Sequence, residues 1–508
     1  MLQRLLLLFV AAGATVAQEP PPDPVFHAGT RLVEVDVVVR HKPVRPPGFR
    51  AGLRYILDTG PPFGPAGALA RGLTKEDFSI LDNGKPQSIA VFGVGPSTGN
   101  GKAASLPAGA VSNRTDSMGR PVNGATAILV DLLNTPFEYT DYARTGLKNL
   151  IRSLSRADSA IALYSLGERL HVLHDFADDS RDLEDAASAL DQPHGRLPPE
   201  YARALRDFGD IMALEGGEDV AADIHGRITF GAVTRIIQHL SGMPGRKSLI
   251  WLSEMAQLPP RLMAMLQRAN IVLYPVMVRC FPAPCGFAAP ESGYAKTTEI
   301  GLTFGGRGFY DASDLFFAFR AAQEDADTAY VLGYYPDEAL LDGKYHRIAV
   351  SLNQAKIDPA TSEVHYRSGY LATRVELPPP PPALAELVDN PLDSSGIGLA
   401  AQATSESENP RLYDVRLTID LHDIRLDHKD GRSTGSFYVS FPDPSVKGNA
   451  RTGLIAIDLT DSQLADKLKT GYSLFAQGVE SDAGEIRMVV RDRATGVAGS
   501  LRVRVDKR

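Results

Sequence analysis

One carboxylate and one hydroxyl group stand out because they follow a short apolar run. The run Ala127–Val130 leads into Asp131, and Thr135 follows in the next turn. Such a run is typical of a strand buried on both faces, and ligands of open α/β sheets bind at the carboxyl ends of these strands. Oxygen atoms of these two kinds could hold a hard divalent cation. The alternative is that Asp131 accepts hydrogen bonds from the turn that follows it, as aspartate commonly does.

The chain has two cysteines, Cys280 and Cys285, which enclose a Phe-Pro-Ala-Pro segment. In an oxidising compartment, two cysteines this close favour a small disulfide, although two free thiols would fit the same spacing. A zinc site would need further Cys or His ligands, and the neighbouring sequence has none. We therefore expect a disulfide between Cys280 and Cys285 that stiffens a loop.

Other polar groups in the sequence have simpler interpretations. His171 and His174 lie on an expected strand, where their spacing places them on opposite faces, so they do not share a metal ion. The acidic stretch Asp175–Asp179 is interpreted as a solvated loop that also caps the helix after it. The triplet Asn113–Thr115 matches a glycosylation acceptor, but the pattern is short.

Length and charge limit the class of protein. A chain of 508 residues is too long for one ordinary core, and about three domains are expected. Apolar residues make up 44% and charged residues 22%, which is usual for a globular protein. The formal net charge of −8 and the absence of a Lys/Arg stripe argue against nucleic-acid binding.

The first residues have the layout of a secretory signal peptide. Arg4 precedes the apolar run Leu5–Ala12, and small residues around Thr15–Ala17 offer a cleavage point. The run is shorter than the roughly 20 residues needed to span a bilayer. No later segment approaches that length, so residues 1–17 predict export to the periplasm or the cell exterior, without a membrane anchor.

Residues 125–325 alternate between strand and helix patterns. Buried strands are expected at Ala127–Val130, Ser159–Tyr164, Ser248–Leu252 and Ile271–Met277. Apolar residues recur at helical spacing from Ala143 to Leu154 and again from Val233 to Leu240. The alternation predicts a doubly wound α/β domain with a mainly parallel sheet.

The regions on either side are expected to be all-β. Residues 25–95 form an N-terminal β domain with a Pro/Gly-rich insertion at 43–72 and a hairpin turn at Asp82–Gly84. The further segments are expected to be a linker at 96–124, a β extension at 326–374, a polyproline linker at 375–383 and a β-sandwich-like domain at 384–508.

Several segments, in order, resemble the bacterial exported VWFA-related family, whose central part is a von Willebrand factor type A-like domain. The resemblance covers about residues 30 to 372 and leaves out the insertion and the C-terminal region. It implies a doubly wound fold that binds other proteins. The matching segments are Arg31–Val39, Gly72–Lys85, Leu106–Arg114, Val130–Thr135, Pro244–Ser253, Thr303–Tyr310, Tyr330–Pro336, Asp342–Val350 and Tyr366–Tyr370.

The resemblance also implies a metal-ion-dependent adhesion site, which is degenerate in this chain. Asp131 and Thr135 match two of its ligands, and Glu254 stands where the family has an aspartate. Leu133 replaces a hydroxyl ligand, and Ala177 lies where a threonine is wanted. Mg²⁺ or Mn²⁺ at Asp131, Thr135 and Glu254 would therefore lack two usual ligands, and magnesium tolerates poor ligand sets badly.

The favoured function is an exported, non-enzymatic protein that binds other proteins in the manner of an adhesin or scaffold. No catalytic residue and no certain cofactor are expected. One alternative is a cell-envelope hydrolase, although the sequence has neither a Gly-x-Ser-x-Gly elbow nor a His-Glu-x-x-His motif. The other is a carbohydrate-binding envelope component that acts through residues 384–508.

Overall fold

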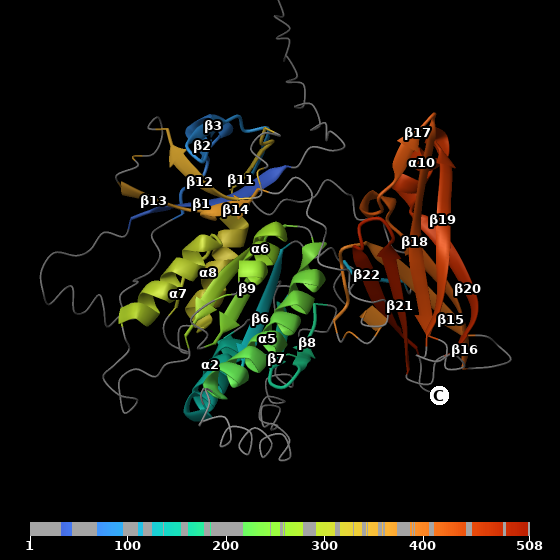
Figure 1. Cartoon of the computed structure of the whole chain (residues 1–508), viewed down its shortest axis with the longest axis horizontal. Coiled ribbons are helices and arrows are strands. Elements are labelled where there is room, and N and C mark those ends of the chain that lie inside the picture. The colour runs from blue at the N-terminus through green and yellow to red at the C-terminus, as the bar shows by residue number, and fades with distance from the viewer. Residues whose placement is uncertain are drawn as a thin grey trace, which may run out of the picture.

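The fold is that of a computed structural model and comprises an α/β unit and two β units (Figure 1). The structure describes residues 32–42, 69–94, 110–114, 124–135, 137–153, 161–176, 183, 217–243, 245–253, 258, 260–277, 291–309, 315–328, 330–337, 342, 344–353, 358, 361–372, 387–388, 390, 392–405, 411–442, 450–480 and 484–505. The expected signal peptide 1–17, the polyproline linker 375–383, Glu254, Ala177 and the pair Cys280 and Cys285 lie outside these residues. Within the described ranges, no helix is both long and apolar enough to cross a membrane.

The α/β unit contains a five-stranded sheet in the order β10-β9-β6-β7-β8. Four of its strands are parallel, and β8 pairs with β7 in the antiparallel direction. The mainly parallel sheet expected for residues 125–325 is therefore present. The strands are β6 (Ala125–Asp131), β7 (Ile161–Leu166), β8 (Leu170–His174), β9 (Lys247–Leu252) and β10 (Ile271–Val276).

Helices cover both faces of this sheet, because successive side chains of a strand point to opposite faces and both sets here are apolar. Ile128 and Val130 of β6 belong to the core that includes α2 and α8. Ala127 and Leu129 belong to the core that includes α5 and α6. The helices are α2 (Phe137–Ser153), α5 (Gly217–Ser241), α6 (Pro260–Arg268), α7 (Glu291–Thr303) and α8 (Leu315–Thr328).

The N-terminal β domain and the β extension, expected as separate segments, form one β unit. Strand β1 pairs with β11 and β13, and β2 pairs with β12, so the blue and the yellow-orange strands of Figure 1 share two four-stranded sheets. Apolar side chains of both segments fill a common core. The strands are β1 (Val33–His41), β2 (Phe78–Asp82), β3 (Lys85–Gln87), β4 (Val91–Val94), β11 (Tyr330–Tyr334), β12 (Tyr345–Leu352), β13 (Ser362–His365) and β14 (Gly369–Leu371).

The hairpin between β2 and β3 turns at the expected Asn-Gly pair. Asn83 has a φ of 46° and Gly84 a φ of 80°, which together are typical of a type I′ turn. A Cβ at Gly84 would meet no atom within 4 Å, so only backbone strain opposes a side chain there.

We predict that Gly84→Ala lowers the free energy of unfolding of the β unit by about 1–2 kcal/mol, the penalty for a left-handed non-glycine residue. Urea unfolding followed by circular dichroism measures this change. Lys85→Ala is the matched control, since Lys85 is exposed in the same hairpin, and it should change stability by less than about 0.5 kcal/mol. An equally small effect for both variants would contradict the strain argument.

A buried cluster of charges joins the β unit to the α/β unit. Arg40 of β1 contacts Asp325 of α8 at 2.5 Å, and the Tyr274 hydroxyl donates to the same carboxylate at 2.8 Å. Arg246 lies 3.5 Å from Asp36 of β1 and donates to Tyr274 at 3.3 Å. The two units therefore meet through paired charges that water does not reach.

The C-terminal unit packs two sheets against one core, as in a β-sandwich. Its elements are β15 (Leu399–Ser405), β16 (Leu412–Ile419), η6 (Leu421–Asp423), β17 (Asp427–Lys429), β18 (Arg432–Pro442), β19 (Ala450–Thr460), α10 (Asp461–Thr470), β20 (Tyr472–Glu480), β21 (Glu485–Asp492) and β22 (Ala498–Arg504).

The segment expected as a linker, 96–124, contributes a strand to this sandwich. Strand β5 (Val111–Ser112) pairs with β15. Residues 96–124 were expected to be a linker over their whole length, and this strand corrects that expectation. The next residue, Asn113, donates from its amide to the carbonyl oxygens of Ser394 and Ile397 and accepts from Leu399 N–H. The Asn113 amide is therefore engaged with the backbone of residues 394–399.

Candidate functional site

Asp131 ends the central strand of the α/β sheet and is completely buried, with 0% exposure. The chain continues from β6 to β7 on one side, whereas β9 lies on the other side of β6. The point between β6 and β9 is therefore where the connections diverge. In open α/β sheets, ligands bind at the carboxyl ends of the strands at such a point.

Side chains from the neighbouring strand reach the Asp131 carboxylate. Trp251, near the end of β9, donates from Nε1 to Oδ2 at 3.2 Å. Ser253, just after β9, donates from its hydroxyl to the same oxygen at 2.9 Å. Trp251 pairs with Leu129 in the parallel register of β9 and β6. Asp131 and Ser253 each lie two residues further along, so the side chains of Trp251, Ser253 and Asp131 share one face of the sheet.

The turn after β6 closes over the same carboxylate. Asn134 donates from its backbone N–H to Oδ1 at 3.0 Å and from its amide to Oδ2 at 2.8 Å. The Thr135 hydroxyl donates to the Asp131 carbonyl oxygen at 2.6 Å. Asn134 also donates to the Thr229 hydroxyl of α5 at 2.9 Å, which connects the turn to the helix. This is the arrangement of an aspartate that organises its own turn.

Burial raises the pKa of Asp131 above its ordinary value, and the hydrogen bonds from Asn134, Ser253 and Trp251 oppose that rise. These three donors are neutral groups, so the carboxylate is stabilised by hydrogen-bond dipoles.

The described residues do not fit a divalent metal ion. Both carboxylate oxygens of Asp131 already accept N–H or O–H groups, and the indole Nε1–H of Trp251 can only donate. In the part of the chain that the structure describes, no three His, Cys, Asp or Glu residues are grouped to hold a metal. A cation at Asp131 would have to displace the Asn134, Trp251 and Ser253 donors.

The structure gives His174 and Asp175 separate partners. His174 is buried, with Nδ1 at 3.0 Å from the Ile161 carbonyl oxygen, and His171 is half-buried. Asp175, expected in a solvated loop, contacts Nε2 of the buried His239 at 2.9 Å. The sequence missed this pair because His239 lies in the apolar stripe of α5, where nothing marks it as an ion-pair partner.

The comparisons with known proteins give structural similarities only. No family model matches the sequence, and no curated protein matches it. A von Willebrand factor type A protein from Catenulispora acidiphila matches with 12% identity and a TM-score of 0.25, over 85% of this chain and 73% of that chain.

Two further solved structures show the same level of similarity. An aerotolerance-related membrane protein from Bacteroides fragilis has 8% identity and a TM-score of 0.25, over 39% of this chain and 98% of its own. The manganese-loaded TRAP protein of Plasmodium vivax has 11% identity and a TM-score of 0.23, over 51% of this chain and 94% of its own. Because the identities and TM-scores are low, we transfer no residue role from these proteins.

Proposed function

We propose that this chain is an exported, non-enzymatic protein of the adhesin or scaffold type. In this proposal a protein partner binds at the carboxyl edge of the α/β sheet, around the turn 132–135, and no metal ion is needed. One observation carries the proposal, namely the internally satisfied Asp131 carboxylate at the point where the sheet connections diverge.

The chemistry of the turn favours a macromolecular partner over a small ligand. A small anion or cation would need a free charge at the centre of the site, and the Asp131 charge is fully engaged by Asn134, Trp251 and Ser253. A protein partner instead contacts a broad surface of backbone and side chains held in a fixed shape. Leu133 of the turn is half-buried and packs in part against the apolar core, and its exposed part is what we expect such a partner to cover.

The test is binding of the mature protein to fractionated envelope proteins, in buffer with EDTA and in buffer with Mg²⁺. We expect retention in both buffers, and we expect Leu133→Ser to weaken it by about tenfold, as for loss of a well-packed contact of roughly 1.4 kcal/mol. Phe475→Ser is the matched control, since Phe475 is 69% exposed on the C-terminal sandwich, away from the turn.

Three outcomes would contradict the proposal. Loss of binding in EDTA would show that a metal ion is needed. Cleavage of peptides or glycans would favour the hydrolase alternative. Retention on polysaccharide that Phe475→Ser weakens and Leu133→Ser does not would favour carbohydrate binding by the C-terminal sandwich. The unfolding transition of each variant, followed by the fluorescence of Trp251, shows whether Leu133→Ser is folded.

A further inference from the structure

A short segment, residues 392–398, lies between the α/β unit and the C-terminal sandwich, and we call it the strap. Leu392 at its start is completely buried in the apolar core beneath α5 and α6. Its later residues pair with β22, since Ser500 N–H donates to the Ser394 carbonyl oxygen at 2.8 Å and Ile397 N–H donates to Ala498 at 3.2 Å. The strap thus contacts both units.

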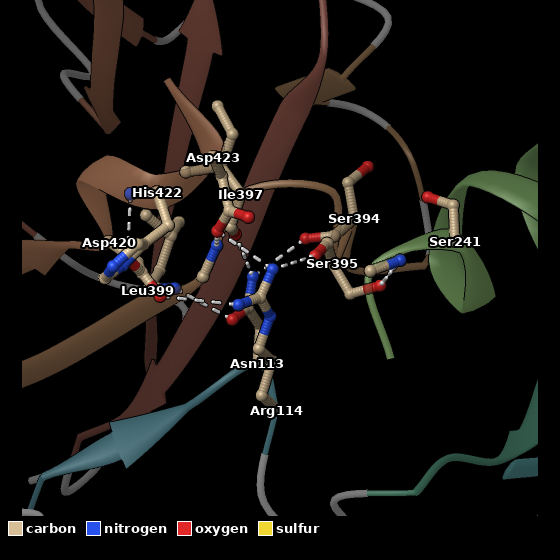
Figure 2. A network of polar contacts seen from close by, with 12 residues as sticks. Asn113, Arg114, Ser241, Ser394, Ser395, Ile397, Leu399, Asp420, His422 and Asp423 are labelled. Carbon is tan, nitrogen blue, oxygen red and sulfur yellow. Dashed lines mark hydrogen bonds and ion pairs between the residues drawn. The ribbon is translucent and has the colours of Figure 1, made fainter. Parts of the chain in front are cut away.

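On the sandwich side, Arg114 holds the strap in place (Figure 2). Its guanidinium donates to the Ser395 carbonyl oxygen at 3.2 Å and to Asp423 at 2.9 Å. Asp423 in turn accepts from Gly398 N–H at 2.8 Å. With Asn113, which bonds three backbone groups of the same stretch, these contacts fix the strap to the sandwich.

On the side of the α/β unit, the strap touches the carboxyl end of α5. Gly242 N–H donates to the Ser395 hydroxyl at 3.0 Å, and that hydroxyl donates to the His239 carbonyl oxygen. The backbones approach so closely that a Cβ at Gly242 would overlap the Ser395 carbonyl group. A glycine is therefore needed at position 242 for the strap to lie against α5.

The His239 ring lies at the centre of this contact. Nε2 is 2.9 Å from the Asp175 carboxylate, and Nδ1 faces the Asp393 carbonyl oxygen. The ring stacks on Phe176, with centroids 5.4 Å apart. Only the doubly protonated imidazolium can donate from both nitrogens, because neutral histidine leaves one lone pair facing an acceptor.

The charged and titratable groups around the ring come from every element packed against it. Asp175 follows β8, Tyr164 of β7 meets the ring edge-on, and Asp393 lies on the strap. Arg487 of β21 and Arg502 of β22 each lie 3.5 Å from the Asp393 carboxylate. The Asp175 carboxylate and the Asp393 backbone carbonyl oxygen face the ring, whereas the Asp393 carboxylate pairs with the two guanidinium groups.

We propose that His239 is a pH-sensitive latch, which in its protonated form holds the strap, and with it the C-terminal sandwich, against the α/β unit. Loss of the ring proton leaves either Asp175 or the Asp393 carbonyl oxygen opposite a lone pair. The strap then loosens at α5, while Arg114 and Asn113 keep it attached to the sandwich.

The direction of the pH effect follows from the surroundings of the ring. Burial lowers the pKa of His239, but Asp175 and Asp393 outweigh burial and raise it above its ordinary value of 6.5. Because docking raises the pKa of His239, the protonated ring stabilises the docked strap fully at pH values below the ordinary pKa. This stabilisation is lost as the pH rises through the raised pKa. The strap is therefore tightest in acid and loosens towards alkaline pH.

Hydrogen exchange of the mature full chain tests the latch between about pH 5.5 and pH 9, the range around the titration of histidine. The Gly242 amide reports the contact, because its N–H donates across it to the Ser395 hydroxyl. Protection of this amide, corrected for the intrinsic exchange rate at each pH, should fall by about tenfold for each unit by which docking raises the pKa of His239. His239→Gln should remove this pH dependence. His422→Gln is the matched control, because His422 is exposed and bonds Asp420 within the sandwich.

Two further measurements keep the test independent of how well His239→Gln folds. Gly242→Ala should expose the amide of residue 242 at every pH while the ring is still present. Resonances of labelled histidine rings, with His239 assigned from the Gln variant, should show both nitrogens protonated below the pH at which protection of the Gly242 amide falls. Constant protection of this amide in the wild-type chain, or an unchanged fall in His239→Gln, would overturn the proposal, whatever the result for partner binding.

Discussion

Replacing Asp131 with alanine is expected to lower the free energy of unfolding of the α/β unit by about 3–5 kcal/mol. The substitution removes the carboxylate that accepts from the buried Trp251 indole and Ser253 hydroxyl and from the half-buried Asn134. Each buried donor left unpaired costs about 1–3 kcal/mol. The total is near the upper end of single-residue effects.

The fluorescence of Trp251 makes this prediction easy to measure. Trp251 is the only tryptophan of the chain, lies in the α/β unit and contacts Asp131 directly. Urea unfolding followed by its emission reports this unit without interference from the two β units. Asp427→Ala is the matched control, since Asp427 is 85% exposed and its loss should change stability by less than about 0.5 kcal/mol.

Added Mg²⁺ or Mn²⁺ should not shift the same transition. A metal present at about 100 times its dissociation constant would stabilise the folded unit by roughly 2.7 kcal/mol, which this assay resolves. A metal-dependent rise in the midpoint that Asp131→Ala abolishes would contradict the closed site. It would show that Asp131, Thr135 and Glu254 do hold a cation, by displacing the neutral donors.

Replacing Asp325 with alanine is expected to lower stability by about 3–5 kcal/mol, because it breaks a buried ion pair from one side. Its carboxylate contacts Arg40 at 2.5 Å and Arg307 at 3.5 Å, and accepts from Tyr274. The Asp325 side chain is 2% exposed and that of Arg40 is 3% exposed, so water does not replace the carboxylate at Arg40, whereas Arg307 is 22% exposed. The variant should loosen the contact between the β unit and the α/β unit.

Glu324→Ala is the matched control for this substitution. Glu324 also pairs with Arg40, at 3.4 Å, but its side chain is 37% exposed, and exposed pairs contribute at most about 1 kcal/mol. Thermal unfolding of both variants, compared with the wild-type chain, measures the difference. Similar losses for Asp325→Ala and Glu324→Ala would show that burial does not control the strength of this cluster.

The pH dependence of the Asp325 variant gives an independent check. Burial raises the pKa of Asp325, but Arg307, Arg246 and Arg40 outweigh burial and hold it below its ordinary value of 3.8. A carboxyl group whose pKa is lowered by folding stabilises the folded state at pH values above its ordinary pKa. This contribution is lost as the pH falls through the pKa of the folded state. The wild-type chain should therefore lose, below about pH 3.8, a stabilisation that Asp325→Ala already lacks.

The sequence was sufficient for features that depend on neighbours along the chain. Apolar runs and helical spacing located β6, β9, β10, α2 and much of α5, because burial on one or both faces is recorded in local periodicity. The Asn83–Gly84 turn was also predictable, since few residues adopt positive φ. Asp131 was recognised as the central polar residue from its place after an apolar run.

Only the tertiary structure decided which distant residues meet. Val33 pairs with Tyr334, so the two outer β segments are one unit, and Val111 pairs with Ala401, so part of the expected linker is a strand. The donors to Asp131 come from β9 and from the turn, and His239 finds Asp175 and Asp393 on two other elements. Periodicity reports how deeply a residue is buried, whereas the identity of a buried polar partner depends on strand order and on how the units dock.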